Sequence, residues 1–163
     1  MTVLVPMSLE VYAGYLKDAI AAYAEDNIAS GRWPAAGALA QSRESFHTLL
    51  PLGLNTPDNY LFEIRIDENG PMVGFLWFAV VEKHHAAAAF VYDLEIKAAF
   101  RRQGHAEAAF ALLEERVREL GLDSIGLHVF ATNDAARALY KKLGYQVTGV
   151  NMQKKLGSDV VTD

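Results

Sequence analysis

Cysteine is absent from this sequence of 163 residues. Without cysteine the chain has no disulfide framework, no thiolate nucleophile and no thiolate ligand for a metal. A long apolar run is also lacking, because none approaches the roughly 18 residues that a membrane-spanning helix needs. The first residues lack the basic region and the apolar run of a signal peptide. These absences favour a cytoplasmic protein with no membrane partner.

A basic surface is missing as well. The formal net charge is −5, from 15 lysines and arginines against 20 aspartates and glutamates. Binding to nucleic acid requires a basic face that neutralises phosphates, so we expect no nucleic-acid partner. A cationic or amine-bearing partner suits this charge better. The sequence leaves open whether the chain is a monomer or a homodimer.

The histidines do not form a metal-binding pattern. His84 and His85 are neighbours in a predicted turn, where two side chains do not easily face one metal. No carboxylate or third histidine stands at ligand spacing from them. We therefore expect no metal.

The length and composition predict one compact domain that spans residues 1–163. Residues 1–57 are expected to form N-terminal helices and a loop, and residues 157–163 a polar tail. Residues 58–156 are expected to form the core of the domain. No repeat and no linker interrupts the chain.

Periodicity predicts an alternation of strands and helices. A helix is expected after Ser8, which can cap it, with an apolar stripe along one face. A weaker stripe and two clear ones predict three more helices, the last of them capped by Thr132 or Asn133. The two N-terminal stripes consist of Leu9, Tyr12, Leu16, Ile20 and Tyr23, and of Leu39, Phe46 and Leu50. Strands are predicted at 3–5, 61–66, 72–81, 87–96, 125–130, 145–150 and 151–156.

A short basic turn joins the strand at 87–96 to the following helix. It reads Arg101-Arg102-Gln103-Gly104-His105-Ala106. The first N–H groups of a helix have no partner within it, and the helix dipole adds positive charge, so such a turn favours anion binding. The turn matches neither a Walker phosphate loop nor a dinucleotide-binding motif. A solvated helix start is the alternative interpretation.

The motifs around this turn resemble those of the GNAT superfamily of N-acetyltransferases. Leu94-Glu95-Ile96 and Arg101-x-x-Gly104-x-Ala106 are followed by Asn133-x-x-Ala136-x-x-x-Tyr140 and Gly144-Tyr145. The resemblance runs from about Tyr60 to Leu156. Ser30-Gly31-x-Trp33, Leu49-Leu50-Pro51-x-Gly53 and Leu127-His128-Val129-Phe130-Ala131 are similar to the YycN-like bacterial members.

The resemblance implies an α/β GNAT fold, with a mixed, mainly antiparallel sheet of about six or seven strands and helices on both faces. It implies an acyltransferase that uses acetyl-CoA as cosubstrate. Acetyl would pass to a primary amine, on a small molecule or a peptide, by direct attack in a ternary complex. Residues 1–57 would form the acceptor side. Two other classes stay open: a non-catalytic acyl-CoA-binding or sensor domain, and an interaction domain.

The resemblance also implies which residues bind the cofactor. Backbone N–H groups of the turn would hold the pyrophosphate, and the preceding strand would pair its backbone with the pantetheine arm. Ala106 stands where glycine is common, and His105 stands where an aliphatic residue is usual. The implied set is Leu94, Ile96, Arg101, Arg102, Gln103, Gly104, His105, Ala106, Asn133 and Ala136.

Tyr140 matches the general acid of the superfamily, which protonates the leaving thiolate. A phenol with a reference pKa near 10 suits this task. A base must also deprotonate the ammonium acceptor, and His128, with a reference pKa near 6.5, is the predicted base. Asp93 and Glu95 compete for this role. Alternation places both on the opposite side of their strand from Leu94 and Ile96.

Overall fold

The computed structural model describes residues 1–157. A polar tail was expected at 157–163, and residues 158–163 of it lie outside the described part. The elements in chain order are β1 (Thr2–Pro6), α1 (Leu9–Ala29), α2 (Ala38–Leu49), η1 (Gly53–Asn55), β2 (Asn59–Ile66), β3 (Met72–Lys83), β4 (Ala86–Ile96), η2 (Ala98–Phe100), α3 (His105–Glu119), β5 (Ile125–Leu127) and α4 (Asp134–Lys142).

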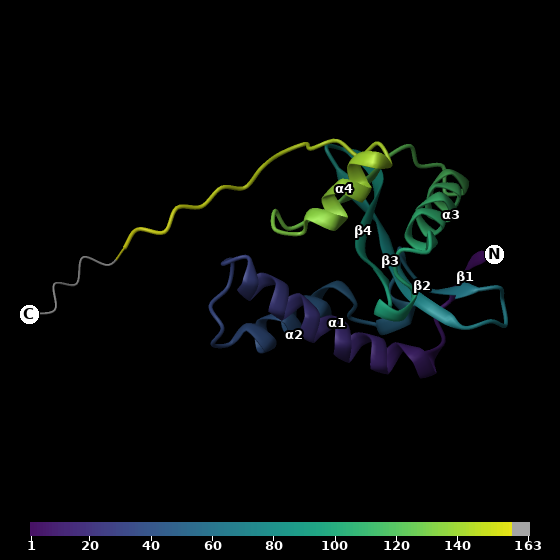
Figure 1. The fold of residues 1–163 in the computed structure, drawn as a ribbon, viewed down its shortest axis with the longest axis horizontal. Helices are drawn as coiled ribbons and strands as arrows, with labels where there is room; N and C mark the ends of the chain where they lie inside the picture. Colours follow the sequence, from purple (N-terminus) through teal and green to yellow (C-terminus); the bar gives the residue numbers. More distant parts are fainter. Residues whose placement is uncertain (158–163) are drawn as a thin grey trace, which may run out of the picture.

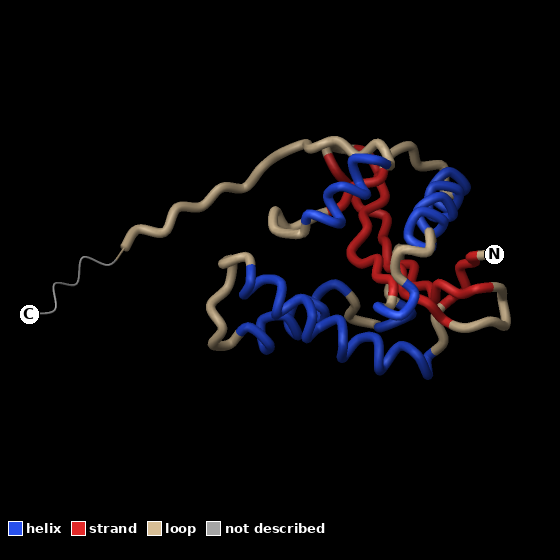
Figure 2. Tube along the Cα trace, viewed as in Figure 1, coloured by secondary structure: helices blue, strands red, loops and turns tan. Residues whose placement is uncertain are grey.

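The strands form one sheet in the order β1-β2-β3-β4-β5. Neighbours from β1 to β4 are antiparallel, whereas β4 and β5 are parallel. Helices α1 and α2 lie on one side of the sheet, and α3 and α4 lie on the other (Figures 1 and 2). The predicted α/β class with helices on both faces is confirmed.

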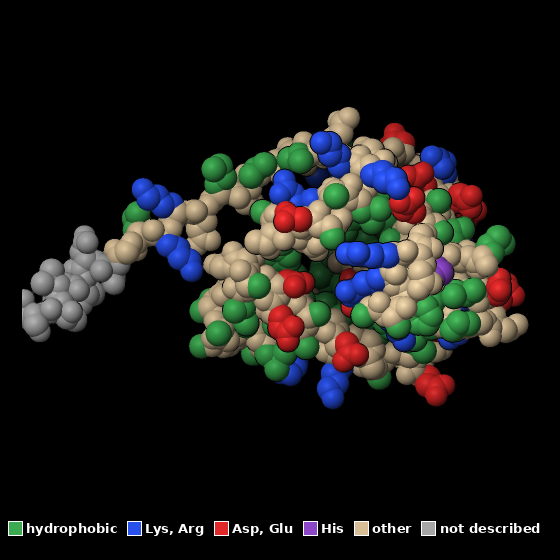
Figure 3. Space-filling view, in the orientation of Figure 1, with side chains coloured by type: hydrophobic (Ala, Val, Ile, Leu, Met, Phe, Trp, Pro, Cys, Tyr) green, Lys and Arg blue, Asp and Glu red, His purple; other side chains and the backbone are tan. Residues whose placement is uncertain are grey.

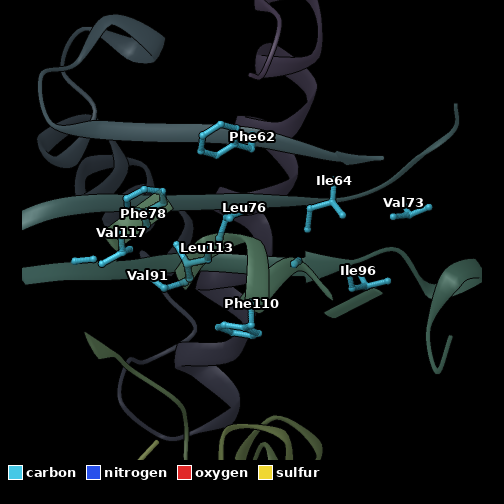
Figure 4. Close-up of a cluster of buried hydrophobic side chains, with 12 residues drawn as sticks. Phe62, Ile64, Val73, Leu76, Phe78, Val91, Ile96, Phe110, Leu113 and Val117 are labelled. Atoms are coloured by element: carbon cyan, nitrogen blue, oxygen red, sulfur yellow. The ribbon is translucent and has the colours of Figure 1, made fainter. Parts of the chain in front are cut away.

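Helix α3 forms the centre of the larger core cluster. Its side chains Phe110, Leu113 and Val117 are almost fully buried. They pack on inward-facing side chains of the strands (Figure 4), and each buried large apolar side chain stabilises the fold by about 1.5–3 kcal/mol. The strand members of this cluster are Phe62, Ile64, Val73, Leu76, Phe78, Ala89, Val91 and Ile96.

Helix α1 begins as the sequence predicts, and most of its expected stripe packs on the core, because Ile20 is buried and Tyr12, Leu16 and Tyr23 pack against the same cluster. Ser8 is the N-cap, and its Oγ accepts a hydrogen bond from Val11 N at 3.2 Å. Leu9, placed on the expected stripe, is 76% exposed because the first turn lies outside the packed interface. Leu39 of α2 is likewise 50% exposed. The buried positions of α1 are Tyr15, Ala19, Ile20, Ala24 and Asn27.

Charged and apolar residues alternate along strand β2, a pattern that is typical of a half-buried strand. Glu63 is instead 2% exposed, since helices cover both faces of the sheet at this strand. Its carboxylate forms an ion pair with Arg65 and accepts a hydrogen bond from Ser8 N at 3.0 Å. A buried charge requires such partners. Glu63 therefore ties β2 to the start of α1.

The described residues form five strands, so the expectation of six or seven is wrong. Residues 145–157, in which two strands were predicted, have no regular structure, and 146–157 are exposed. The strand predicted at 125–130 is limited to Ile125–Leu127. A strand requires a partner edge, and within residues 1–157 these segments have none.

We predict that Leu113→Ala lowers the free energy of unfolding by about 2–5 kcal/mol, because it leaves a cavity in the packed core. Leu120→Ala is the matched control, since Leu120 ends the same helix and is 41% exposed. It should cost less than about 1 kcal/mol. Urea denaturation followed by circular dichroism measures both, and equal losses would contradict this account of the core.

Candidate active site

Strands β4 and β5 diverge after a short paired stretch. Ala89–Val91 pair with Ile125–Leu127, whereas β4 pairs with β3 along nearly its whole length. Trp77 lies opposite Asp93 and Phe78 opposite Val91, so Tyr92 is an extra residue that forms a bulge. Bulges turn the following residues and often lie next to active sites. Residues 92–96 of β4 therefore have one backbone edge that β5 does not cover.

The basic turn lies at the end of this free edge. Arg102 and Gly104 have φ values of 61° and 84°, in the left-handed region. Gly104 is the N-cap of α3 and offers no side-chain acceptor, so the first N–H groups of α3 are free to meet a ligand. A pocket of about 200 Å³ opens there. It is lined by Ile96, Phe100, Arg101, Arg102, Gly104, His105, Ala106, Glu107 and Leu139.

Two side chains of the turn are held by the sheet. Arg101 Nε donates to Ile96 O at 2.9 Å, and its guanidinium lies 3.9 Å from the Glu95 carboxylate. His105 Nδ1 lies 3.1 Å from Thr2 Oγ1, and its Nε2 is buried without a partner among residues 1–157. The side chain of His105 thus packs against β1. The group of His105 that can meet a ligand at the turn is its backbone N–H.

Helix α4 positions Tyr140. Of the two predicted caps, Asn133 is the N-cap, and its Oδ1 accepts from Ala136 N at 3.2 Å. The ring of Tyr140 lies edge-on to Phe110, with centroids 5.6 Å apart, and 5.8 Å from Tyr145. Burial raises the pKa of Tyr140, and the charge of Asp93 raises it further. The phenol therefore stays protonated at neutral pH.

Asp93 lies on the α1 side of β4. Its Oδ2 accepts a hydrogen bond from Tyr15 OH at 2.7 Å. Burial raises the pKa of Asp93 to about 6, and the charges of Glu95 and Asp26 act in the same direction. The hydrogen bond from Tyr15 lowers this pKa and so partly offsets the burial. Asp93 is a carboxylate that can exchange a proton near neutral pH.

His128 follows β5 directly and is exposed. Its ring packs edge-on against Phe130, with centroids 5.0 Å apart. Partial burial of the ring lowers the pKa of His128, and the positive charge of Arg32 lowers it further. The charged group that acts on His128 thus comes from the loop after α1, whereas the charge of Asp93 acts on Tyr140.

A second pocket, of about 350 Å³, lies on the α1 side of the sheet. Figure 3 shows a recess with a hydrophobic floor, acidic side chains on the side of α1 and basic ones on the opposite rim. Leu94 and Ile96 pack on the α3 side, whereas Glu95 lines this pocket, which confirms the predicted alternation. The lining is Val11, Gly14, Tyr15, Asp18, Met72, Phe75, Glu95 and Lys97.

Sequence reasoning missed Tyr15, which ties α1 to β4. The predicted stripe passes through Tyr12 and Leu16, whereas the buried positions of α1 begin at Tyr15. Tyr15 lies four residues before Ala19, and this helical spacing was the sequence signal that could have placed Tyr15 on the buried face.

Residues 1–157 contain no group of three or more histidine, cysteine, aspartate or glutamate side chains that could hold a metal ion. In the same part of the chain, no helix combines the length and the apolar character needed to cross a membrane.

An anion-binding turn before α3, a free edge on β4 and a tyrosine on α4 define an acyltransferase of the GNAT type. The Acetyltransferase (GNAT) family model matches residues 19–145, which is more than half of the chain. The chain belongs to this family and is an N-acetyltransferase. Enzymes of the family use acetyl-CoA and acetylate amine-bearing acceptors.

Two bacterial relatives match nearly the whole chain. The uncharacterized N-acetyltransferase YycN of Bacillus subtilis (strain 168) is 38% identical over 94% of this chain and 97% of its own length. YdgE of the same organism, also an uncharacterized N-acetyltransferase, is 35% identical over 92% of this chain and 95% of its own. The crystal structure of B. subtilis YycN superposes with a TM-score of 0.90, covering 96% of this chain and 99% of that one.

The raised pKa of Asp93 predicts a stability that depends on pH. Its folded value of about 6 exceeds the unfolded value near 3.9, so the folded protein binds the proton more tightly. Stability from this group is present below about pH 4 and is lost as the pH rises through about 6. Asp93→Asn keeps an acceptor for Tyr15 and should raise the unfolding free energy at pH 7.5 by about 1–2 kcal/mol.

Urea denaturation at pH 4.5 and 7.5 measures the effect, with Asp123→Asn as control because Asp123 is exposed. The control should follow the wild type at both pH values. The prediction is contradicted if Asp93→Asn is less stable than the wild type at pH 7.5, because the surroundings would then stabilise the charged carboxylate.

Proposed function

We propose that this enzyme transfers acetyl from acetyl-CoA to a primary amine by direct attack in a ternary complex, with Tyr140 as the acid and Asp93 as the base. The arrangement that carries this proposal is the uncovered edge of β4 after Val91, with Asp93 on that strand and Tyr140 on α4 close enough for the charge of Asp93 to raise the pKa of Tyr140. The acid comes from α4 and the base from β4, so one group serves each side of a bound thioester. Direct attack needs such a pair and no covalent intermediate.

The turn and the free edge of β4 support the binding of acetyl-CoA. The pocket at the turn brings together Ile96 and five predicted residues between Arg101 and Ala106. Backbone N–H groups at the start of α3 are suited to the pyrophosphate. The uncovered backbone of Leu94 to Ile96 is suited to the amides of the pantetheine arm. Asn133 and Ala136 support the site by capping α4, which carries Tyr140.

Tyr140 is suited to donate a proton to the leaving thiolate. Its raised pKa keeps the hydroxyl protonated until a strong base forms beside it. The negative charge of Asp93 contributes to this shift. An acid that stays protonated at neutral pH matches a thiolate, which is basic only after the bond to the acetyl group breaks.

Asp93 is better placed than His128 to take the proton of the ammonium. Its pKa of about 6 leaves it ionised at neutral pH yet able to accept a proton. His128 instead lies beside Arg32, whose charge disfavours the protonated imidazole that a base must become. Tyr15 holds the Asp93 carboxylate with its 2.7 Å hydrogen bond. Tyr15 is thus a positioning residue.

The acidic surroundings of Asp93 support an amine as the acceptor. Glu95 and Asp26 lie close enough to raise the pKa of Asp93, and Asp18 lines the pocket on the same side of the sheet. A protonated amine is attracted to such a region before it loses its proton. Lys97 at the same pocket provides one positive charge, which would suit an acceptor that also carries an acidic group.

Tyr140→Phe should lower the turnover of acetyl-CoA with an amine acceptor at least tenfold, because the leaving thiolate loses its proton donor. Tyr145→Phe is the matched control, since its ring lies in the same aromatic cluster and its hydroxyl has no partner in the described part of the chain. The assay is thiol release across a panel of amines.

Calorimetry with acetyl-CoA should give the same affinity for both variants. Binding without turnover for any amine in the panel would instead favour a non-catalytic sensor domain. A Tyr140→Phe enzyme as active as the wild type, with chemistry rate-limiting, would remove Tyr140 as the acid.

The rate should rise with pH through a limb near pH 6 as Asp93 loses its proton. Asp93→Asn should lower the rate and abolish this limb, whereas His128→Asn should keep it. Tyr15→Phe should move the limb to higher pH, because the hydrogen bond from Tyr15 lowers the pKa of Asp93. The measurement is the pH dependence of kcat/KM; a limb that vanishes only in His128→Asn would assign the base to His128.

A further inference from the structure

Helix α1 turns one face toward the pocket on its side of the sheet. Four of its residues line this pocket at offsets of three, four and seven, which places them on one helical face. These residues are Val11, Gly14, Tyr15 and Asp18. The pocket shares no lining residue with the one at the turn before α3. Its side chains are therefore available to a molecule other than the cofactor.

Gly14 leaves open space on this face of α1. A Cβ atom added at Gly14 would have no atom of the described neighbours within 4 Å, so packing within residues 1–157 does not require glycine there. Glycine in the middle of a helix is less favourable than alanine, because it loses more backbone freedom on folding. Gly14 thus widens the pocket at the expense of helix stability.

Lys97 provides a positive charge on the opposite wall of the pocket. Its backbone N donates to Val73 O at 2.8 Å, which fixes the residue against β3, and its side chain is half-buried with Nζ 5.6 Å from the centre of the Phe75 ring. Within residues 1–157 Lys97 forms no ion pair. Glu95 lines the same pocket, but its carboxylate lies 3.9 Å from the guanidinium of Arg101 instead. A half-buried ammonium without a carboxylate partner is suited to an acidic group of a ligand.

The distance along β4 limits which molecules can meet both Asp93 and Lys97. Alternation places Asp93, Glu95 and Lys97 on the same face of the chain, and each strand residue advances about 3.3 Å, so the Cα of Lys97 lies about 13 Å beyond that of Asp93. The Lys97 ammonium lies beside the ring of Phe75, which pairs with Glu95, only two residues or about 7 Å from Asp93. The positive charge is therefore about 7–13 Å from Asp93 along the strand. The ammonium and carboxylate of an α-amino acid are too close together to span this distance.

We infer that Lys97 selects acceptors in which the amine and a carboxylate are several bonds apart, and that the pocket along α1 holds the chain between them. This inference rests on the proposed function, because it places the amine at Asp93. Asp18 and Glu95 attract the ammonium end, and Lys97 binds the carboxylate end. The open space at Gly14 accommodates the chain of the acceptor. Lys97 is thus a specificity-determining residue.

The test compares γ-aminobutyrate and ε-aminocaproate with their amides as acceptors, because each amide keeps the amine and the chain length but lacks the negative charge. In the wild type, kcat/KM should be at least tenfold higher for the carboxylates than for the amides, through a lower KM. Lys97→Met should reduce this ratio to about one and leave the calorimetric affinity for acetyl-CoA unchanged. Lys17→Met is the matched control, since it removes the same charge from an exposed position of α1 outside the lining, and it should keep the ratio.

Gly14→Leu provides the second measurement. It should raise the KM for ε-aminocaproate at least tenfold without lowering the melting temperature, because leucine favours a helix and fills the open space. Ala13→Leu, at an exposed position outside the lining, should leave this KM unchanged.

The outcomes separate this inference from the proposed function. Equal kcat/KM values for carboxylates and amides in the wild type, or a preference that persists in Lys97→Met, overturn the inference and leave the proposed transfer intact. An unchanged KM in Gly14→Leu shows that the acceptor lies elsewhere and also overturns it. A wild type that binds acetyl-CoA but acetylates neither these compounds nor simple alkylamines contradicts the proposed transfer, and the inference falls with it.

Discussion

The short pairing between β4 and β5 is the constraint on which the site depends. Three residues of each strand hold the sheet together, and beyond them the bulge at Tyr92 turns β4 away from β5. The opening leaves one backbone edge of β4 uncovered beside the turn before α3. Asp93 lies on the α1 side of this strand and Tyr140 on the α3 side of the sheet, and the charge of Asp93 still raises the pKa of Tyr140. The proposed cofactor site and the proposed acid and base therefore all depend on this short pairing.

Glu63 is a buried carboxylate and Asp93 a half-buried one, and the fold compensates their charges to different extents. Glu63 is almost completely buried and has Arg65 and a backbone N–H as partners, so its charge is compensated. Asp93 has a single hydroxyl as partner and acidic neighbours, so its charge is poorly compensated. The first arrangement fixes the start of α1 against β2. The second leaves a carboxylate that destabilises the fold at neutral pH, which is typical of groups kept for proton transfer.

Local patterns predicted most elements, and tertiary contacts decided the rest. The cap at Ser8, the turn before α3 and the cap at Asn133 follow from neighbouring residues, and the structure confirms them. The exposure of Leu9 depends on where α1 leaves the sheet, and periodicity does not contain that information. The link from Tyr15 to Asp93 joins positions 78 residues apart. The position of Tyr140 on the last helix was predictable from its motif, whereas the proposal of Asp93 in place of His128 required the charges around each side chain.

Helix α1 explains why the acceptor is harder to infer than the cofactor. The turn before α3 offers backbone N–H groups, and a short sequence motif is enough to specify such a turn. The pocket on the α1 side is formed by side chains from α1, β3 and β4, and each can vary without disturbing the backbone of the turn. The same helix also supplies Tyr15, which contacts Phe75 and holds Asp93. If the proposed roles hold, a change of acceptor through α1 must preserve Tyr15, and this couples the selection of the amine to the position of Asp93.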